Sequence, residues 1–310
     1  MFQQMEARRV IMDGILNINK ATGMTSHDVV ARVRKLLKQR RVGHAGTLDP
    51  TASGVLPICV GQGTRVAEYL SESGKAYLAE IVFGVVTDTY DVEGAILRTA
   101  DAADLTLARI EQALPHFLGK QQQVPPRYSA IKIQGQPAYK RTRAGEEVAL
   151  EPRPIEITKL EITAWESPRL TLAVECSKGT YIRSLAYDLG EYLACGAHLG
   201  GLARTRSGPF SLEESITLET LAEAIDEDTV ARYLHPADEA IQHYPAIILD
   251  EPAVERVLHG NAFPDTSDSL DAPLAKHSKI ARVYATDRHF LAIAEWDTER
   301  QVWQPTKVFG

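Results

Sequence analysis

A short loop rich in glycine and proline holds the residues with the clearest chemical potential. Residues 43–50 read Gly-His-Ala-Gly-Thr-Leu-Asp-Pro, which brings an imidazole, a hydroxyl and a carboxylate together. Pro50 excludes Asp49 from the helical region of backbone conformation, and the glycines permit close approach of the backbone. Asp49 is therefore a candidate for carboxylate chemistry. The simpler alternative is an Asx turn, in which its carboxylate only bonds nearby amides.

Two further residues are candidates to work together with such a carboxylate. Residues 179–183 read Gly-Thr-Tyr-Ile-Arg at the start of a predicted helix, where Arg183 could hold a catalytic carboxylate in its ionised form. Tyr77 shares a strand face with Ala79 and Ile81, and its ring could stack on a base. The alternatives are a solvent-exposed ion pair for Arg183 and a core position for Tyr77.

Strands and helices in alternation must position these side chains. The residue patterns predict strands at 14–20, 55–60, 75–85, 155–162 and 170–176. Pro57 predicts that the second of them lies at a sheet edge or contains a bulge. Thr25 or Ser26 should start a helix, and Thr180 should cap another that ends at Leu193. This order predicts an α+β fold with a mixed, largely antiparallel sheet and flanking helices.

Charge is distributed unevenly along the chain. The 34 Lys and Arg residues against 41 Asp and Glu give a net charge of −7, which argues against a protein that coats nucleic acid through its overall charge. Cations nevertheless gather at residues 32–41 and 127–143, whereas residues 211–230 contain no Lys or Arg. The segment 121–154 is bracketed by prolines and is predicted to be a basic excursion from the core.

The C-terminal part has a pattern of its own. After a break near Tyr244 and Pro245, we expect a short helix and three short strands, at 281–286, 289–296 and 302–309. About 65 residues of this kind favour a small β-rich appendage. The predicted domains are therefore residues 10–245 and 246–310.

Several classes of protein are excluded by what the sequence lacks. It has no P-loop, and its histidines and three cysteines lack the spacing of a metal site or a disulfide framework, so no cofactor and no metal are expected. No apolar run reaches the roughly 18 residues of a transmembrane helix, and the first ten residues lack a signal-peptide core. We therefore expect a cytoplasmic protein with reduced cysteines and no membrane association.

At residues 43–57 the sequence resembles the TruB family of tRNA pseudouridine synthases. Four further segments resemble the family's lysine, tyrosine, arginine and leucine motifs in the family's order, namely residues 19–26, 75–77, 176–184 and 198–205. The resemblance spans about residues 14–210. It departs from the family pattern at Asn19 and Ala21, in place of Asp and Pro, and at Arg65, in place of Lys.

The resemblance implies a role for each matched residue. Asp49 would be the catalytic aspartate, acting as nucleophile or base on a flipped-out uridine, with Arg183 as its ion-pair partner and Tyr77 stacked on the base. The substrate-binding residues would be His44, Tyr181, Leu202, Lys20, Arg65, Arg141 and Arg143, with Lys20 also bracing the loop. The basic insertion, at about 122–153, would close on the RNA, and residues 246–310 would form a PUA-like RNA-binding domain.

The resemblance implies an isomerase that makes pseudouridine from the T-loop uridine, at position 55 of tRNA. Its partner would be the T-arm of tRNA, and we predict no obligate protein partner. The reaction is redox-neutral and needs no metal, which agrees with the missing motifs. Two alternatives stay open at this point: a tRNA-binding folding chaperone with secondary catalysis, and a carboxylate glycoside hydrolase.

Overall fold

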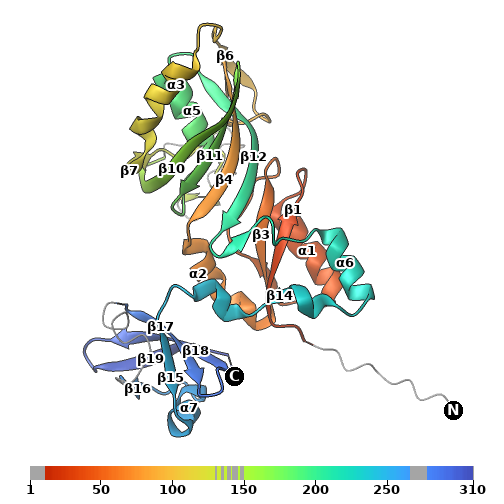
Figure 1. Cartoon of the computed structure of the whole chain (residues 1–310), viewed down its shortest axis with the longest axis vertical. Helices are drawn as coiled ribbons and strands as arrows, with labels where there is room; N and C mark the ends of the chain where they lie inside the picture. Colours follow the sequence, from red (N-terminus) through yellow and green to blue (C-terminus); the bar gives the residue numbers. More distant parts are fainter. Residues whose placement is uncertain are drawn as a thin grey trace, which may run out of the picture.

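The protein is described by a computed structural model, which covers residues 11–129, 131–133, 136–137, 141, 146, 150–265 and 278–309. A long sheet occupies the upper and middle parts of the molecule, and a smaller sheet lies at its lower end (Figure 1). Within the described residues, no helix has both the length and the apolar character needed to span a membrane.

The large sheet is antiparallel except where β12 runs parallel to β3. In spatial order its strands are β14 (Leu234–His235), β1 (Gly14–Lys20), β3 (Ser53–Val60), β12 (Ala197–Ser207), β4 (Lys75–Phe83), β11 (Arg169–Cys176), β10 (Arg153–Glu166) and β7 (Gly119–Gln123), while β2 (Val42–His44) pairs with β3 and β13 (Phe210–Ser211) pairs with β12. This arrangement confirms the predicted mixed, largely antiparallel sheet.

Helices cover the sheet in two groups, and each group has its own hydrophobic core. The helices α1 (Ser26–Leu37) and α6 (Leu218–Asp226) lie over β1 and β3, and α3 (Leu107–Ala113) and α5 (Ile182–Tyr192) lie over the other half (Figure 1). Tyr77 on β4 and Leu202 on β12 pack against both cores. These two predicted site residues therefore mark the seam between the halves of the sheet.

The helix starts agree only in part with the sequence patterns. The Thr25 hydroxyl accepts from the Asp28 amide at 3.1 Å, and the Asp28 carboxylate accepts from the Thr25 amide at 2.8 Å, so a capping box starts α1 as expected. The prediction that Thr180 caps α5 is wrong. Tyr181 is the N-cap residue and gives no side-chain cap, while the Thr180 hydroxyl donates to the Ser177 carbonyl at 3.0 Å.

The prediction that Pro57 marks an edge or a bulge is also wrong. β3 lies inside the sheet, and its register with β1 is regular through Pro57. On the other side, β12 pairs only with Ser53 and Gly54, and β2 begins its pairing at Ile58. On that side the Pro57 carbonyl accepts from the Ala45 amide at 3.0 Å, just after β2 ends. The missing N–H of the proline therefore faces the end of the short strand β2, where the loss of one ladder bond is tolerated.

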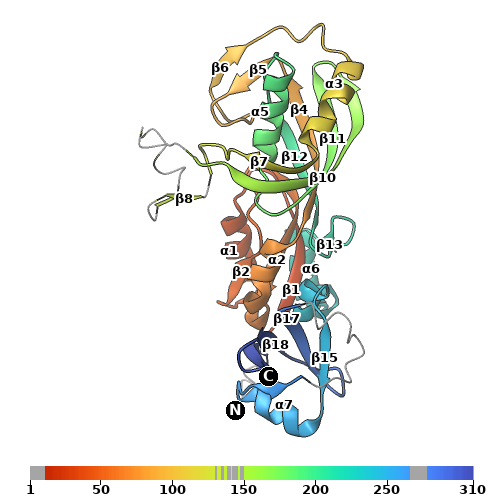
Figure 2. The same cartoon turned by 90° about the vertical axis from the view of Figure 1, so that its left-hand side faces the viewer.

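The remaining elements are short connections around the sheet. They are η1 (Gly61–Val66), α2 (Ala67–Glu72), the hairpin of β5 (Val85–Thr87) and β6 (Ile96–Thr99), η2 (Leu114–Phe117), the hairpin of β8 (Lys132–Ile133) and β9 (Gln136–Pro137), η3 (Val230–Tyr233) and η4 (Ala237–Ile241). The β8–β9 hairpin belongs to the predicted basic excursion and projects from the body of the molecule (Figure 2).

A separate five-stranded sheet forms the C-terminal unit. Its elements are β15 (Ala246–Leu249), α7 (Glu251–Leu258), β16 (Phe263–Pro264), β17 (Ile280–Ala285), β18 (Phe290–Asp297) and β19 (Val302–Val308). The expected small β-rich unit is thereby confirmed, whereas the domain bounds 10–245 and 246–310 stay a prediction. Ile293 of this unit packs in one cluster with Ile15 and Tyr69, which anchors the unit to the larger body.

Candidate active site

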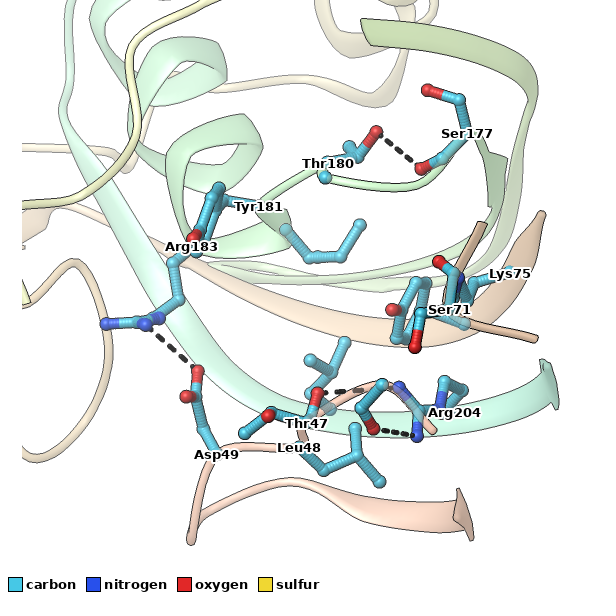
Figure 3. Close-up of a pocket in the computed structure, with 15 residues that line it drawn as sticks. Thr47, Leu48, Asp49, Ser71, Lys75, Ser177, Thr180, Tyr181, Arg183 and Arg204 are labelled. Carbon is cyan, nitrogen blue, oxygen red and sulfur yellow. Dashed lines mark hydrogen bonds and ion pairs between the residues drawn. The ribbon is translucent and has the colours of Figure 1, made fainter. Parts of the chain in front are cut away.

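A cavity of about 290 Å³ lies beside the Asp49 loop. The loop between β2 and β3 forms one wall, and β4, β12 and the start of α5 form the others. Asp49, Tyr77 and Arg183 all line it, together with Tyr181 and Leu202. Five residues predicted from distant parts of the sequence thus line one cavity, and Figure 3 shows three of them, Asp49, Tyr181 and Arg183, around it.

Asp49 and Arg183 form the ion pair that their residue types suggested. Nη2 of Arg183 lies 3.0 Å from Oδ2 of Asp49. The arginine side chain is 7% exposed and the aspartate side chain 42%. The buried guanidinium stabilises the negative charge of a carboxylate that remains accessible from the cavity.

Arg183 itself is held by more than Asp49. Its guanidinium donates to the carbonyls of Thr89 at 3.3 Å and Tyr128 at 3.1 Å, and it lies 3.5 Å from the carboxylate of Asp91. Asp91 is buried, and it accepts from the Thr89 hydroxyl at 2.5 Å. Since two carboxylates share one buried cation, Arg183 keeps a counter-charge when Asp49 engages another group.

Arg204 fixes the first half of the Asp49 loop. This side chain, 1% exposed, extends from β12 and donates through Nη2 to the Gly46 carbonyl at 2.9 Å and through Nε to the Val55 carbonyl at 2.7 Å. A third, longer contact of 3.5 Å joins Nη1 to the Thr47 carbonyl. The guanidinium thereby ties the two ends of the loop to the middle of the sheet.

Two more buried side chains hold the second half of the loop. The Ser26 hydroxyl donates to the Leu48 carbonyl at 3.1 Å and accepts from the Leu48 amide at 2.9 Å. Lys20 is fully buried, and its amine donates to the Met24 carbonyl at 2.8 Å and, at 3.4 Å, to that of Pro50. Burial lowers the pKa of Lys20 to about 8, although the nearby Asp49 opposes this shift. Lys20 thus occupies the bracing position, outside the cavity lining.

The two tyrosines present their rings at the cavity with hydroxyls that stay protonated near neutral pH. Burial raises the pKa of Tyr77 above its ordinary value, and the guanidinium of Arg204 opposes the rise. Burial also raises the pKa of Tyr181. The backbone of Tyr181 is fixed by Gln123, whose side-chain amide accepts from its N–H at 2.8 Å and donates to its carbonyl at 3.0 Å.

The buried amine of Lys75 lies at the far end of the cavity. Figure 3 shows Lys75 and Ser71 opposite the Asp49–Arg183 pair. The Lys75 amine donates to the carbonyls of Ser71 at 2.6 Å and Ser73 at 2.5 Å, which end the helix α2. Burial lowers the pKa of Lys75 to about 8, and the charge of Arg204 adds to the effect. The cavity therefore combines one carboxylate with three buried basic side chains.

A larger cavity of about 690 Å³ lies on the other side of the ion pair. Asp49 and Arg183 line both cavities, and the start of α1 and the segment with Asp88 and Asp91 complete the second one. The ion pair therefore borders two hollows.

Four of the predicted substrate-binding residues lie outside both cavity linings, namely Lys20, Arg141, His44 and Arg65. His44 ends β2 with its ring edge-on to His27 at 5.3 Å between centroids, and burial lowers its pKa. Arg65 donates to the Val308 carbonyl and lies over the ring of Phe309, so it joins η1 to the end of the C-terminal unit. Substrate contact by these residues stays a prediction.

The basic excursion is described only in part. Arg141 forms an ion pair with Glu146 at 2.6 Å. Arg143 lies outside the described residues, as does much of the segment 122–153. The role of this segment in RNA binding stays a prediction.

Three site residues escaped the sequence reasoning. Asp91 follows a short strand with no motif around it. Arg204 lies in the leucine motif and Lys75 in the tyrosine motif, but neither motif assigned them a role. The pairing of β4 with β12, which sets Tyr77 opposite Arg204 and Lys75 opposite Ser207, brings Arg204 and Lys75 to the cavity. Among the described residues, no group of His, Cys, Asp and Glu is arranged to hold a metal ion.

Comparison with known proteins agrees with this geometry. A family model described as TruB family pseudouridylate synthase (N terminal domain) matches residues 34–182, and one described as tRNA pseudouridylate synthase B C-terminal domain matches residues 183–242. The chain is 45% identical over 298 residues to tRNA pseudouridine synthase B of Dehalococcoides mccartyi, covering 96% of this chain and 97% of the relative. It is 43% identical to the enzyme of the same name from Pseudomonas aeruginosa, covering 94% of each chain.

Solved structures show the same fold. One, titled as an H/ACA RNP bound to a substrate RNA containing 2′-deoxyuridine, is 26% identical with a TM-score of 0.73, and the match covers 97% of this chain and 86% of the other. Another, titled as a Cbf5-Nop10-Gar1 complex, is 29% identical with a TM-score of 0.71, and the match covers 91% and 78%. On the sequence matches, which extend over almost the whole chain, this protein belongs to the TruB family of pseudouridylate synthases.

Proposed function

We propose that the protein is an isomerase that converts the T-loop uridine of tRNA, at position 55, into pseudouridine. The observation that supports this proposal most directly is the accessible Asp49 carboxylate. It pairs with the buried Arg183 on the wall of a cavity that Tyr77 also lines. The names of the relatives, tRNA pseudouridine synthase B, support the substrate and the reaction.

Asp49 acts on the target uridine as nucleophile or base. In the reaction the bond between N1 of uracil and C1′ of ribose breaks, the uracil turns, and a bond from C5 to C1′ forms, with one proton leaving C5 and one arriving at N1. The change is redox-neutral. The buried Arg183 guanidinium supplies the counter-charge of the Asp49 carboxylate and fixes its position at 3.0 Å.

Tyr77, Tyr181 and Leu202 receive the base. Extrusion of the uridine from its stack costs a few kcal/mol, and stacking on an aromatic ring recovers about 1–3 kcal/mol. Tyr77 and Leu202 are suited to this task because both are packed into the two cores and cannot shift independently. The detached uracil must also be kept from diffusing away, which is the role we propose for closure of the insertion at 122–153.

Recognition of tRNA extends beyond the cavity. We propose that the insertion at 122–153 closes on the T-arm, with contacts from Arg141 and Arg143, and that His44 and Arg65 contribute further contacts. Residues 246–310 would act as a PUA-like RNA-binding domain beside a catalytic domain at 10–245. We also propose a cytoplasmic location, which a tRNA substrate supports.

The decisive test is Asp49→Asn, which keeps the size of the side chain and removes its charge. Wild type should convert an unmodified tRNA transcript, as read by pseudouridine mapping, whereas the variant should bind the transcript and leave it unmodified. Asp104→Asn is a matched control, because Asp104 is an exposed aspartate outside both cavities. Conversion by Asp49→Asn at the wild-type rate would refute the assignment.

The same reaction mixture separates the two alternative functions. Isomerisation leaves the mass and the strand of the tRNA intact, whereas a glycoside hydrolase would release base or sugar. A folding chaperone with secondary catalysis would still promote tRNA folding as the Asp49→Asn variant, and one that had lost its chemistry would produce no pseudouridine even as the wild type.

A further inference from the structure

A groove of about 670 Å³ lies at the C-terminal end of α1, away from the Asp49 cavity. Lys38, Arg40 and Arg41 line one side of it, and Gly61 and Gln62 of η1 line the other. The three cations are exposed. We call this hollow the basic groove.

The charge of the surrounding segment is one-sided. Between Asp28 and Asp49 the chain contains six Lys and Arg residues and no Asp or Glu, in a protein whose net charge is −7. Cations near the end of α1 have a simpler explanation, because they complement the helix dipole. The helix dipole accounts for Arg34 and Lys35, which lie in the last turn of α1. It does not account for Arg40 and Arg41, which lie beyond the end of the helix.

The backbone that carries the cations is held rigidly. The Gln39 side chain donates to the Met12 carbonyl at 2.8 Å and accepts from the Met12 amide at 3.1 Å. The Arg41 carbonyl accepts from the Gly61 amide at 2.8 Å. Because these bonds fix the chain on both sides of Arg40, the cations are presented without further loss of backbone freedom on binding.

The acid and one of the cations in the groove are already engaged. Asp13 also lines it, and its carboxylate accepts from the Gln62 amide at 2.6 Å. Arg41 donates to the Thr64 hydroxyl at 2.8 Å. Lys38 and Arg40 are therefore the cations best suited to reach an incoming anion.

The position of the groove relates it to the proposed RNA path. The three-residue strand β2 leads from Arg41 directly to His44 and the Asp49 loop. On the other side, η1 leads from Gly61 to Arg65, which contacts the C-terminal unit. In Figure 2, α1, β2 and the β8–β9 hairpin lie on the same side of the molecule.

We propose that the basic groove binds the phosphate backbone of the tRNA, between the catalytic cavity and the C-terminal unit. The inference rests on the proposed function, because it takes tRNA as the partner. Its contacts are to phosphates, which carry no sequence information, so the groove sets the register of the RNA relative to Asp49.

The test is the salt dependence of tRNA binding by the full chain with Lys38→Gln and Arg40→Gln combined. Each lost phosphate contact lowers the slope of log K against log salt by about 0.7–0.9. Between 50 and 200 mM salt, wild type should therefore lose roughly tenfold more affinity than the double variant. The matched control is Lys159→Gln with Arg169→Gln, which removes the same charge from two exposed residues paired with Glu161 and Glu80.

Two results would overturn the proposal: an unchanged salt slope in the groove variant, or an equal reduction in the control variant, which would indicate a net-charge effect. The wild-type arm reports on the proposed function separately. If wild type modifies the transcript and the slopes do not differ, only the groove assignment fails. If wild type neither binds nor modifies tRNA, the proposed function itself fails.

Discussion

Replacing Arg204 by glutamine should slow conversion about 100-fold while leaving a folded protein that still binds tRNA. The glutamine amide nitrogen takes the place of the arginine Nε, so the variant can keep the bond to the Val55 carbonyl. It loses both Nη contacts, at 2.9 Å to Gly46 and 3.5 Å to Thr47. The substitution therefore releases the Asp49 loop selectively.

The magnitude follows from these contacts. One buried carbonyl left without its donor costs about 1–3 kcal/mol, which is a fraction of the roughly 5–15 kcal/mol that stabilises a folded protein. Release of the loop displaces Asp49 from Arg183, and a misplacement of about 1 Å can cost roughly 100-fold in rate. The free energy of unfolding should thus fall by about 1–3 kcal/mol, which leaves the protein folded, while the rate falls about 100-fold.

The assay is single-turnover conversion of a tRNA transcript, with denaturant unfolding and tRNA binding measured on the same preparations. Arg206→Gln is the matched control, because Arg206 lies two residues along the same strand, is 40% exposed and pairs with Glu175 at 2.6 Å. A surface pair of this kind contributes about 0–1 kcal/mol, so the control should be unchanged. A folded Arg204→Gln protein with wild-type single-turnover rate would refute the reasoning.

Three other perturbations test separate parts of the structure. Asp91→Asn should slow single-turnover conversion about 10–100-fold, because Arg183 would lose its remaining counter-charge when Asp49 acts; a wild-type rate would contradict this. The pKa of Lys75 is about 8 in the folded protein and 10.5 in its ordinary state. Between these two pH values the folded protein therefore binds fewer protons than the unfolded chain, and its stability rises with pH. Denaturation across this range should show wild type gaining stability relative to Lys75→Met as pH rises, and parallel curves would exclude the effect. Phe309→Ala removes the ring beneath Arg65 and should weaken the attachment of the C-terminal unit to the larger body by about 1 kcal/mol of interaction free energy. The expected result is faster limited proteolysis near residue 245, and an unchanged rate would contradict it.

Local patterns predicted the elements that local physics determines. The strand Gly14–Lys20 and the helix Ser26–Leu37 follow from apolar spacing and a capping box, and both occur as expected. Pro57 misled because its effect depends on which neighbouring strand faces its nitrogen, and that is a property of the whole sheet.

The site was predictable only where a motif marked it. Asp49, Tyr77 and Arg183 lie in recognisable segments and do line one cavity. Asp91 and Arg204 act through contacts with residues far away in the sequence, Asp91 with Arg183 and Arg204 with Gly46 and Val55. The motif that contains Arg204 did not reveal these contacts. Arg65 stands where the family usually has Lys, and the structure places it against the C-terminal unit.

The seam formed by Tyr77 and Leu202 has a consequence for how the enzyme fails on heating. Because both side chains pack against both hydrophobic cores, melting of either half of the sheet would remove part of the packing that positions them. Activity should therefore be lost as soon as the less stable half of the sheet opens, even where the other half stays folded. On heating, inactivation should come no later than the first loss of sheet structure.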